Sequence, residues 1–373
     1  MKSILYLMHV PWQWIKQRPH FFAEYLSKQY EIDILYKYPL KVSRKNLVNR
    51  NFGDLSVKSF FQFPFKKFKA LSFLSFLNRL FFRFSISQKK INSYDYIWIT
   101  SVSLYPIISH LITDKTNVIW DCMDDEMEFQ PVKDNKTILE NFLLAEKELM
   151  NNAKVIICSS DYLSQKIQNR TGIFRKCFVI NNAIELPKID KNLNETEKSK
   201  LNFVKNQDNV FMYIGTISEW FDFDTLVETL EENEDINIIL IGPSDVKIPQ
   251  HNRITHLGTI KREHIFAFMN YAKALIMPFK INELIKSVNP VKIYEYIWMG
   301  LPVIATRYGE TEKFSDYIYL YSSTKEFFDI SRNIVDSKFT AKKTIFESKK
   351  FAESNQWKNR CQEILKILAT KDN

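Results

Sequence analysis

The sequence predicts an α/β protein made of two domains, each built on a sheet of mostly parallel strands. Three observations lead to this prediction. The chain has 373 residues, which is long for one ordinary hydrophobic core and typical of two domains. Short apolar runs alternate with helical patterns along its length, as they do in βαβ units. A polar stretch at 188–209, which has no periodicity, separates the two halves.

The domain boundaries follow from this division. We predict a Rossmann-like N-terminal domain at 1–187, a linker at 188–209 and a second Rossmann-like domain at 210–351, with the two domains facing a central cleft. A last helix at about 352–373 is expected to pack back on the first domain. A cleft of this kind suits an enzyme with two substrates.

Each apolar run is expected to form one buried strand, with helices between most of the strands. The strands predicted in the first half are 4–10, 32–36, 57–63, 96–100, 118–121, 155–159 and 178–181. Those predicted in the second half are 211–214, 236–241, 254–257, 274–277, 302–305 and 317–320.

Four glycines stand at strand or helix ends of the second half, namely Gly215, Gly242, Gly258 and Gly300. Ligands of open α/β sheets bind beyond the carboxyl ends of the strands, where glycine lets the backbone approach a phosphate or a base. Plain turns would explain any one of these glycines, but less easily all four. The richer ligand site is therefore expected in the second domain. Neither GxGxxG nor a P-loop motif occurs, which disfavours nicotinamide, flavin and P-loop chemistry.

The segment 287–306 holds the most informative pattern. Pro290 suits the first turn of a helix and Gly300 suits its end. The amides of Val288, Asn289 and Val291 would then lie at a helix N-terminus, which forms an anion site suited to a pyrophosphate.

Two charged residues follow on the same helix. Lys292 and Glu295 are three positions apart and share a face. We expect Lys292 to neutralise a phosphate and Glu295 to accept hydrogen bonds from ribose hydroxyls, as binding of a nucleotide diphosphate requires. The alternative is an i,i+3 surface ion pair.

This segment resembles the donor-site signature of GT-B glycosyltransferases of family 4, in which a Glu on this helix holds the ribose. Further motifs fall in the family's order and spacing, at 158–160, 179–184, 213–216, 241–243 and 256–259. A branch similar to teichuronic-acid and related surface-polysaccharide glycosyltransferases shares the runs 14–20, 121–125 and 217–224.

The resemblance implies transfer of a sugar from a nucleotide diphosphate donor to a lipid-linked glycan acceptor, in surface-polysaccharide (lipopolysaccharide or capsule) synthesis. It also implies retention of anomeric configuration and no cofactor. The expected donor-binding residues are Gly215, Thr216, Gly242, Pro243, Gly258, Thr259, Ser287, Val288, Asn289, Pro290, Val291, Lys292 and Glu295. The expected catalytic residues are Asp121, Asp124, Asp125 and Arg18, and the acceptor side is expected to hold Trp12, Trp14 and Lys16.

The sequence departs from the wider family at three places. Ser287 stands where the common pattern has a sugar-facing Glu, and Glu283 comes four residues earlier. The basic residue usual after the first strand of the second domain is missing, so Lys292 and Arg18 are expected to supply positive charge. An aromatic segment replaces the usual glycine-rich loop after the first strand.

The sequence Asp222-Phe223-Asp224 matches the DxD metal motif of another glycosyltransferase fold. It stands just before a helical pattern, where Asp is a good N-cap, and we favour that interpretation. Amides and cations can stabilise a departing diphosphate, so no metal is predicted.

The net charge of +9 is concentrated in one stretch. From 55 to 94 there is no acid, and ten phenylalanines accompany eight bases. Bases mixed with aromatics are typical of a surface that contacts anionic lipid, here through 58–90. A core helix with solvated bases is the alternative, and the lack of a recognised motif disfavours nucleic acid. The bases are Lys58, Lys66, Lys67, Lys69, Arg79, Arg83, Lys89 and Lys90.

No apolar run is long enough to span a bilayer, and the first run is short for a signal peptide. We therefore expect a cytoplasmic protein, peripheral on the inner face of the cell membrane. The four cysteines show no metal-like spacing and are expected to be reduced and mostly structural.

Two other functions stay open at this point. One is a nucleotide-sugar epimerase or hydrolase of the same fold. The other is a non-catalytic membrane-peripheral scaffold. The donor sugar, the base, the acceptor, the linkage and the oligomeric state cannot be derived from the sequence.

Overall fold

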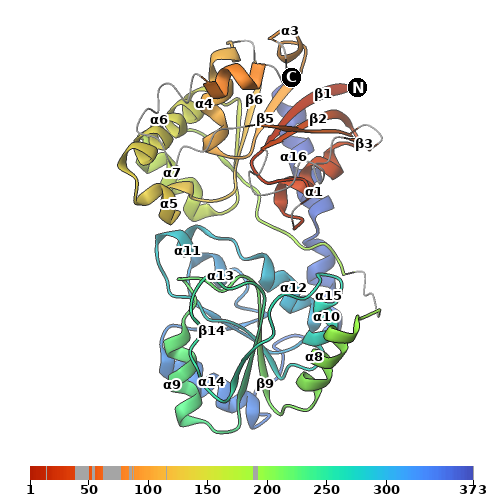
Figure 1. Ribbon diagram of the computed structural model, residues 1–373, viewed down its shortest axis with the longest axis vertical. Coiled ribbons are helices and arrows are strands. Elements are labelled where there is room, and N and C mark those ends of the chain that lie inside the picture. Colours follow the sequence, from red (N-terminus) through yellow and green to blue (C-terminus); the bar gives the residue numbers. More distant parts are fainter. Residues whose placement is uncertain are drawn as a thin grey trace. The chain divides into compact units, whose positions relative to one another are not determined.

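The computed structural model describes residues 1–13, 15–37, 50–52, 55–61, 77–83, 86, 88–114, 116–187 and 192–372. The chain divides into two compact units. The first comprises Met1–Asn182 and Trp357–Asn373, and the second comprises Ala183–Gln356. Each unit is an α/β structure built on one sheet (Figure 1). The predicted fold class is thereby confirmed.

The first unit contains an eight-stranded sheet with the order β3-β4-β2-β1-β5-β6-β7-β8. All neighbouring strands are parallel except the edge strand β3, which is antiparallel to β4. The strands are β1 (Lys2–Met8), β2 (Tyr30–Lys37), β3 (Arg50–Phe52), β4 (Leu55–Phe60), β5 (Tyr96–Ile99), β6 (Val118–Cys122), β7 (Val155–Cys158) and β8 (Phe178–Val179).

Helices and short 3-10 turns connect these strands. They are α1 (Arg18–Leu26), α3 (Gln88–Ile91), η3 (Val102–Leu104), α4 (Tyr105–Ile108), η4 (Ser109–Leu111), η5 (Glu126–Glu128), α5 (Gln130–Lys133), α6 (Lys136–Asn152), α7 (Asp161–Thr171) and the C-terminal α16 (Trp357–Asp372). Residues 77–83 are also helical.

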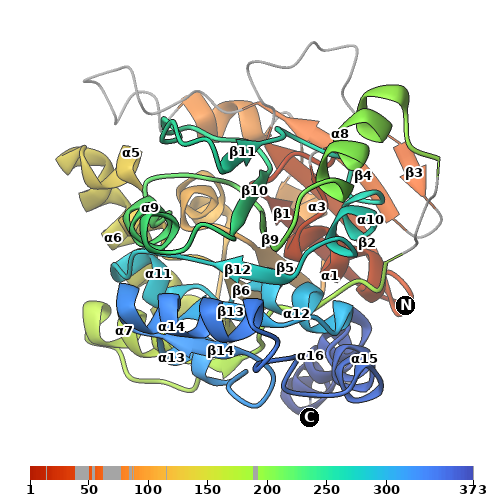
Figure 2. The same ribbon diagram turned by 90° about the horizontal axis from the view of Figure 1, so that it is seen from below.

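The second unit contains a six-stranded parallel sheet with the order β11-β10-β9-β12-β13-β14, which can be followed from edge to edge in Figure 2. Its strands are β9 (Val210–Ile214), β10 (Asn237–Ile241), β11 (Ile254–His256), β12 (Ala274–Met277), β13 (Val303–Thr306) and β14 (Tyr319–Tyr321). Its helices are α8 (Glu195–Lys205), α9 (Phe223–Glu232), α10 (Ile265–Met269), α11 (Glu283–Ser287), α12 (Val291–Met299), α13 (Gly309–Glu312), α14 (Thr324–Val335) and α15 (Ile345–Ser354).

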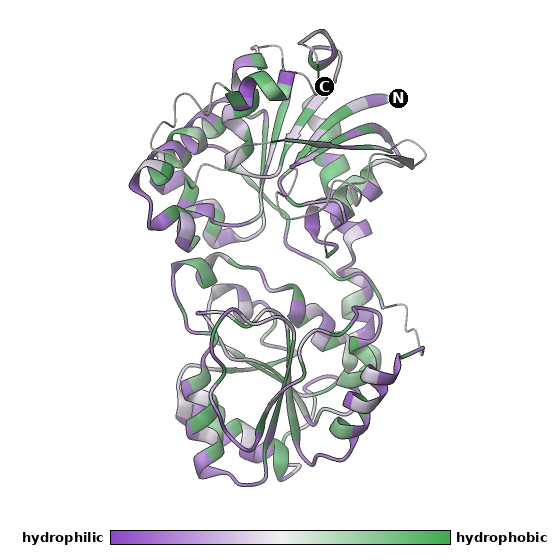
Figure 3. Ribbon diagram, viewed as in Figure 1, coloured by the Kyte–Doolittle hydropathy of each residue, from purple (hydrophilic) through white to green (hydrophobic). Residues whose placement is uncertain are grey.

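The central strands are apolar on both faces because helices cover a parallel sheet on both sides. All of β5, β7, β9, β12 and β13 is buried. Figure 3 shows green, hydrophobic residues along the sheets of both units. Every strand that the sequence predicts is present. The strand β3 was not predicted, because Arg50-Asn51-Phe52 contains no apolar run.

The structure corrects the prediction that residues 188–209 form a linker. Residues 188–191 lie outside the described residues, but α8 occupies 195–205 and belongs to the second unit. A capping box begins this helix, because Asn194 and Glu197 each accept a hydrogen bond from the other's backbone amide. Leu201 and Val204 then pack on the core of the second unit. Apart from these two residues and the exposed Phe203, the helix is polar, so its apolar pattern is weak and the capping box is its clearer signal.

The chain passes between the two units twice, and the two passages lie side by side. Ile184 and Gln356 form a parallel β-bridge. The structure therefore divides the chain at 182/183 and 356/357, not at the predicted 187 and 352. None of the helices in the described ranges has the length and apolar content that crossing a bilayer requires.

The helix α16 returns to the first unit and lies beside α1 (Figure 1). Trp357 begins this helix and is 2% exposed. Its ring stacks on Phe21 at a centroid distance of 4.9 Å and meets Phe22 edge-on at 5.6 Å. These contacts attach the end of the chain to its first helix.

We predict that Trp357→Ala lowers the free energy of unfolding by about 3–5 kcal/mol, because a large buried ring leaves a cavity. Urea denaturation followed by circular dichroism measures the change. Phe174→Ala is the matched control, since Phe174 lies in the same unit and is 74% exposed. Equal stability of the two variants would contradict the anchoring role of Trp357.

Candidate functional site

The helix α12 carries a buried carboxylate held by two cations. The Glu295 side chain is fully buried, and its Oε2 accepts a hydrogen bond from Lys292 Nζ at 3.0 Å. Arg262 Nη2 lies 2.7 Å from Oε1. Burial acts to raise the pKa of Glu295, but Lys292 and Arg262 outweigh this effect and the pKa is lowered. The carboxylate is therefore ionised at neutral pH.

Arg262 was not among the predicted site residues. It lies in the segment between β11 and α10, four positions after the predicted Gly258. A basic residue so close to a recognised motif was a signal that could have been used. The pair of Lys292 and Glu295 does exist, as the ion-pair alternative proposed, but the carboxylate is buried and not on the surface.

The N-terminus of α12 is uncapped, since Pro290 supplies no side-chain hydrogen bond. The amides of Val291 and Lys292 lie in the first turn, where a helix offers no carbonyl to accept them. Asn289 is buried, and its Nδ2 donates to Glu310 Oε2 at 2.8 Å. The Asn289 side chain thus holds the loop that precedes the helix in place.

The structure corrects the prediction that the Val288 amide is available to a ligand. This amide donates to the Ile285 carbonyl at 3.0 Å, and the Val288 carbonyl accepts from Tyr308 Oη at 3.1 Å. The last turn of α11 extends to this residue, so its backbone supports the loop. Ser287 Oγ donates to the Leu284 carbonyl at 2.6 Å, and Glu283 pairs with Lys286.

Three of the predicted glycines meet at the carboxyl ends of neighbouring strands. The amide of Gly215 donates to the Ile241 carbonyl, and that of Gly242 donates to the Gly258 carbonyl, both at 2.9 Å. Gly242 has a φ of +140°, and a Cβ there would lie 2.0 Å from the Gly215 carbonyl oxygen. Only glycine fits this approach of two strand ends. Thr216, Pro243 and Thr259, which follow these glycines, are exposed.

Asp222 is the N-cap of α9, so the cap interpretation is confirmed. Its Oδ1 accepts from the Thr225 amide at 3.3 Å and its Oδ2 from Thr225 Oγ1 at 2.8 Å. Asp224 instead pairs with Lys280 at 2.7 Å. The two carboxylates therefore have separate partners. Within the described residues, no group of three metal-binding side chains is found.

In the first unit, Arg18 and Asp121 form a buried ion pair with Nη2 and Oδ1 2.8 Å apart. Arg18 Nη1 donates to the Ile180 carbonyl at 2.6 Å, and the guanidinium lies 4.6 Å from the centre of the Phe22 ring. These contacts join α1 to the ends of β6 and β8. Arg18 is 3% exposed, and Asp121 and the Ile180 carbonyl contact its guanidinium. Its role as a cation for the diphosphate stays a prediction.

Asp125 also belongs to an ion-pair network. Its oxygens lie 2.9 Å from Arg170 Nη1 and 2.9 Å from Lys166 Nζ. Arg170 Nη2 pairs in turn with Glu146 Oε1 at 2.7 Å, which ties α7 to α6. Asp125 is 1% exposed. The network gives Asp125 a structural role, and its catalytic role stays a prediction.

Asp124 differs from both neighbours, since within the described part of the chain it has no ion-pair partner within 4.0 Å. It is partly buried. Burial raises the pKa of Asp124 to about 6, with Asp121 and Asp125 adding to the effect and Arg18 opposing it. Of the three predicted acids, it is the one without an ion-pair partner among the described residues.

Sequence reasoning missed two further polar groups at the same strand ends. Glu126 accepts from Ser101 Oγ and from the Val102 amide, both at 2.7 Å, and burial raises its pKa to about 7. The other group is His9, which follows β1. The only signal for either was its position after an apolar run.

Hydrogen bonds fix the tautomer of His9. Thr100 Oγ1 donates to the Leu7 carbonyl at 3.1 Å and must therefore accept from His9 Nδ1, which lies 2.8 Å away. The His9 Nε2 is left as an acceptor. Burial lowers the pKa of His9 to about 4, so the ring is neutral at physiological pH.

The predicted acceptor-side residues follow β1. Trp12 packs against His20 with ring centroids 5.3 Å apart. Lys16 pairs with Glu24 at 2.7 Å and lies over the Phe21 ring. Trp14 lies outside the described residues.

The basic aromatic segment is described only in part, since Lys66, Lys67 and Lys69 lie outside the described residues, as does the side chain of Lys89. Phe60 and Phe82 are buried and meet edge-on at 5.4 Å, as the core-helix alternative requires. Leu80 and Phe81 are each 40% exposed, and Arg83 is exposed beside them. This segment therefore contributes to the core and to the surface.

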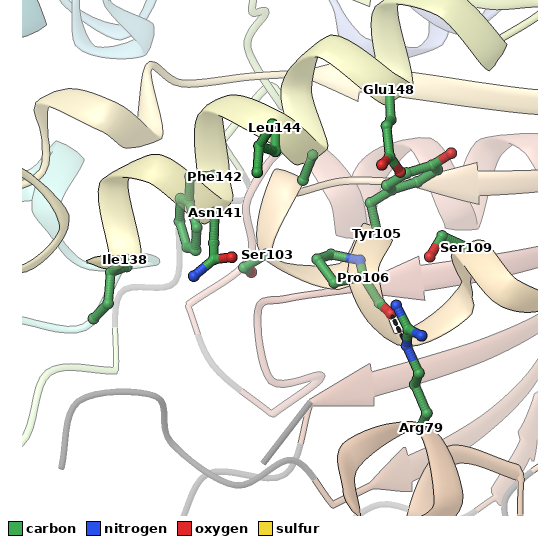
Figure 4. A pocket seen from close by; sticks show the side chains of 11 residues that line it. Arg79, Ser103, Tyr105, Pro106, Ser109, Ile138, Asn141, Phe142, Leu144 and Glu148 are labelled. Carbon is green, nitrogen blue, oxygen red and sulfur yellow. Dashed lines mark hydrogen bonds between the residues drawn. The ribbon is translucent and has the colours of Figure 1, made fainter. Parts of the chain in front are cut away.

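A cavity of about 210 Å³ lies between residues 77–83, α4 and α6 (Figure 4). Arg79, Asn141 and Glu148 line it together with apolar side chains. Arg79 Nε donates to the Pro106 carbonyl at 3.0 Å, as Figure 4 shows. No sequence motif pointed to this cavity.

Comparisons with known proteins agree with this geometry. Residues 208–329 match the family described as glycosyl transferases group 1. The TuaH protein of Bacillus subtilis (strain 168), named as a teichuronic acid biosynthesis glycosyltransferase, is 26% identical over 231 residues. That alignment covers 58% of this chain and 57% of TuaH.

Solved structures match over the whole chain. Sucrose-phosphate synthase from Thermosynechococcus elongatus has a TM-score of 0.71 at 14% identity and covers 99% of both chains. HepE from Anabaena, in complex with UDP-glucose, has a TM-score of 0.69 at 12% identity and covers 99% of this chain and 100% of its own. These likenesses show a common fold.

The fold is therefore that of the GT-B glycosyltransferases. Within the second unit, residues 208–329 are similar to the glycosyl transferases group 1 family.

The geometry predicts opposite effects for two neighbouring acids. We expect Asp121→Ala to lower the free energy of unfolding by about 3–5 kcal/mol, since it leaves Arg18 buried without its partner. Asp124→Asn should change that free energy by less than about 1 kcal/mol, because no ion pair is lost.

Sugar-transfer activity should show the reverse pattern for Asp124. We expect Asp124→Asn to reduce kcat by about 100-fold or more, the scale of a lost acid–base or charge-stabilising group. Urea denaturation and a donor-consumption assay measure the two effects. A fully active Asp124→Asn variant would exclude the catalytic role.

Proposed function

We propose that this protein transfers a sugar from a nucleotide diphosphate donor to a glycan acceptor, with the donor bound by the second unit. One observation carries the proposal. An uncapped helix N-terminus, two cations and a buried carboxylate meet on α12. The helix N-terminus would bind an anion such as a diphosphate, the cation Lys292 would add positive charge beside it, and the carboxylate would bind a ribose diol.

Each part of the donor has a partner in this proposal. The amides of Val291 and Lys292 receive the diphosphate, and Lys292 adds positive charge. Glu295 accepts hydrogen bonds from the ribose hydroxyls. The glycines at the ends of β9, β10 and β11 let the nucleotide approach the backbone. The UDP-glucose complex of HepE, a protein of the same fold, supports this class of donor.

The chemical step is proposed to need no metal ion and no cofactor. The leaving diphosphate gains negative charge as the sugar departs, and helix amides with Lys292 stabilise it. Asp124 would stabilise positive charge at the anomeric carbon or orient the acceptor hydroxyl. Retention of anomeric configuration is part of the proposal because the family resemblance implies it.

The acceptor is proposed to be a lipid-linked glycan in surface-polysaccharide synthesis. The likeness to TuaH, named for teichuronic acid biosynthesis, supports this assignment. The protein would act at the cytoplasmic face of the membrane, held by the basic aromatic segment at 58–90. Exposed Leu80, Phe81 and Arg83 are the described residues that support this contact.

Glu295→Ala and Lys292→Ala are each expected to weaken donor binding by about 1–3 kcal/mol, since each removes a charge-assisted hydrogen bond. Calorimetric titration measures this loss, after a thermal-shift panel of UDP-, GDP- and dTDP-sugars has identified the base.

Glu228→Ala serves as the control for these variants, because Glu228 is exposed on α9 of the same unit. Unchanged nucleotide affinity in both site variants would remove the proposed donor site. Sugar transfer to an added acceptor separates a transferase from a hydrolase or epimerase, and the absence of any turnover would favour a scaffold.

The membrane proposal predicts binding to anionic liposomes at low salt and poor binding to neutral ones, since each base near an anionic surface contributes roughly 1 kcal/mol. Replacement of Lys66, Lys67, Lys69, Arg79 and Arg83 by Gln should abolish the binding. Activity on a short soluble acceptor should persist. Liposome co-sedimentation and a transfer assay are the measurements.

A control with the same charge change is available in the second unit. Its five substitutions to Gln are at the exposed residues Lys198, Lys205, Lys325, Lys338 and Lys349. If this control loses liposome binding as fully as the 66–83 variant, net charge and not the segment is responsible.

A further inference from the structure

Arg262 has no part in the proposal so far, although it contacts the central carboxylate. Its Nη2 lies 2.7 Å from Glu295 Oε1. The Arg262 side chain is 31% exposed, whereas that of Glu295 is 0% exposed. The guanidinium therefore joins the loop after β11 to the buried face of α12.

The two oxygens of Glu295 are not equivalent. Oε2 accepts a hydrogen bond from Lys292 Nζ, one helical turn away. Oε1 is buried, and Arg262 Nη2 lies 2.7 Å from it without the alignment of a regular hydrogen bond. The charge of Arg262 compensates Oε1, and this oxygen keeps acceptor capacity for a hydroxyl from outside the chain.

This arrangement also explains how a buried carboxylate stays ionised and ordered. Lys292 has a flexible side chain and lies on the same helix as Glu295, so by itself it would not fix the orientation of the carboxylate. Arg262 approaches from a different segment and constrains the other oxygen. Together they hold the carboxylate from two sides, while each oxygen keeps acceptor capacity for a ligand hydroxyl.

We propose that Arg262 is a positioning residue that holds Glu295 ionised and oriented so that Oε1 accepts a ribose hydroxyl of the donor. The proposal rests on the donor site proposed above. It implies that the protein selects ribonucleotides over deoxyribonucleotides with the help of a residue that does not itself contact the nucleotide. A deoxy analogue would leave Oε1 buried without a donor, which a site built for a hydroxyl penalises strongly.

The competing role for Arg262 is direct contact with the diphosphate. In that role its removal would weaken all nucleoside diphosphates alike, whatever their sugar. In the positioning role its removal should affect only nucleotides that carry the ribose hydroxyl that Glu295 reads.

The test uses calorimetric titration of the full chain with UDP and GDP and with their 2′-deoxy and 3′-deoxy forms. The wild type should bind a ribonucleotide about 10- to 100-fold more tightly than one of its deoxy forms, the range of a hydrogen bond to a charged group. Arg262→Ala should lose most of this preference and bind the deoxy form within about twofold of the wild type. Arg262→Lys should restore part of the preference.

A double-mutant cycle with Glu295→Gln tests whether Arg262 affects nucleotide binding through Glu295. If Arg262 acts through Glu295, Arg262→Ala should have no further effect in the Glu295→Gln background. Equal weakening of ribo and deoxy forms, or additive losses in the cycle, would overturn the proposal in favour of a diphosphate contact.

Two controls keep the outcome interpretable. Arg332→Ala removes an exposed arginine of α14 in the same unit and should change nothing. If Arg262→Ala does not fold, Arg262→Gln and Arg262→Lys provide the same comparison. A wild type that binds no nucleoside diphosphate refutes the donor site itself. Binding that depends on Glu295 but not on Arg262 refutes only the positioning role.

Discussion

A carboxylate buried away from water costs several kcal/mol unless a cation and hydrogen-bond donors meet it. Both sheets of this protein place acids beyond or beside the ends of their strands. For three of these acids an arginine from another segment supplies the opposite charge. The pairs are Arg18 with Asp121, Arg170 with Asp125 and Arg262 with Glu295. Each arginine joins two segments that the fold brings together.

The same constraint separates structural acids from acids that can act on a substrate. Asp121 and Asp125 form ion pairs with arginines, whereas Asp124 has no ion-pair partner among the described residues. Its raised pKa reflects burial beside two other acids. Glu126 shares this environment but is held by Ser101 and the Val102 amide. A short run of acidic residues thus yields different chemical roles, which the environment of each side chain determines.

In the second unit the charged groups gather at the helix that carries the proposed donor site. The α12 N-terminus supplies amides, Lys292 supplies charge, and the buried Glu295 supplies acceptors. None of these features alone would define a site, since helix ends and ion pairs are common. The α12 features and the closely approaching Gly215 and Gly242 all lie within residues 208–329, which match the glycosyl transferases group 1 family.

The sequence by itself determined the two-sheet architecture, the order of the strands along the chain and the α12 segment. Apolar runs, glycines at strand ends and a Pro-to-Gly helix are local signals. It also placed the cap at Asp222, because capping depends on neighbours three residues away. Helix α8 was within reach of the same reasoning, since Asn194 and Glu197 form a capping box.

The tertiary structure alone decided which charged groups meet. Arg18 lies beside Asp121, Arg170 beside Asp125 and Arg262 beside Glu295. Strand order in a parallel sheet and the path of its crossovers bring these residues together, and no periodicity in the sequence records those distances. Sequence reasoning singled out these acids, but it could not tell that Asp121 and Asp125 are ion-paired, that Asp124 has no ion-pair partner among the described residues, or that a second cation contacts Glu295.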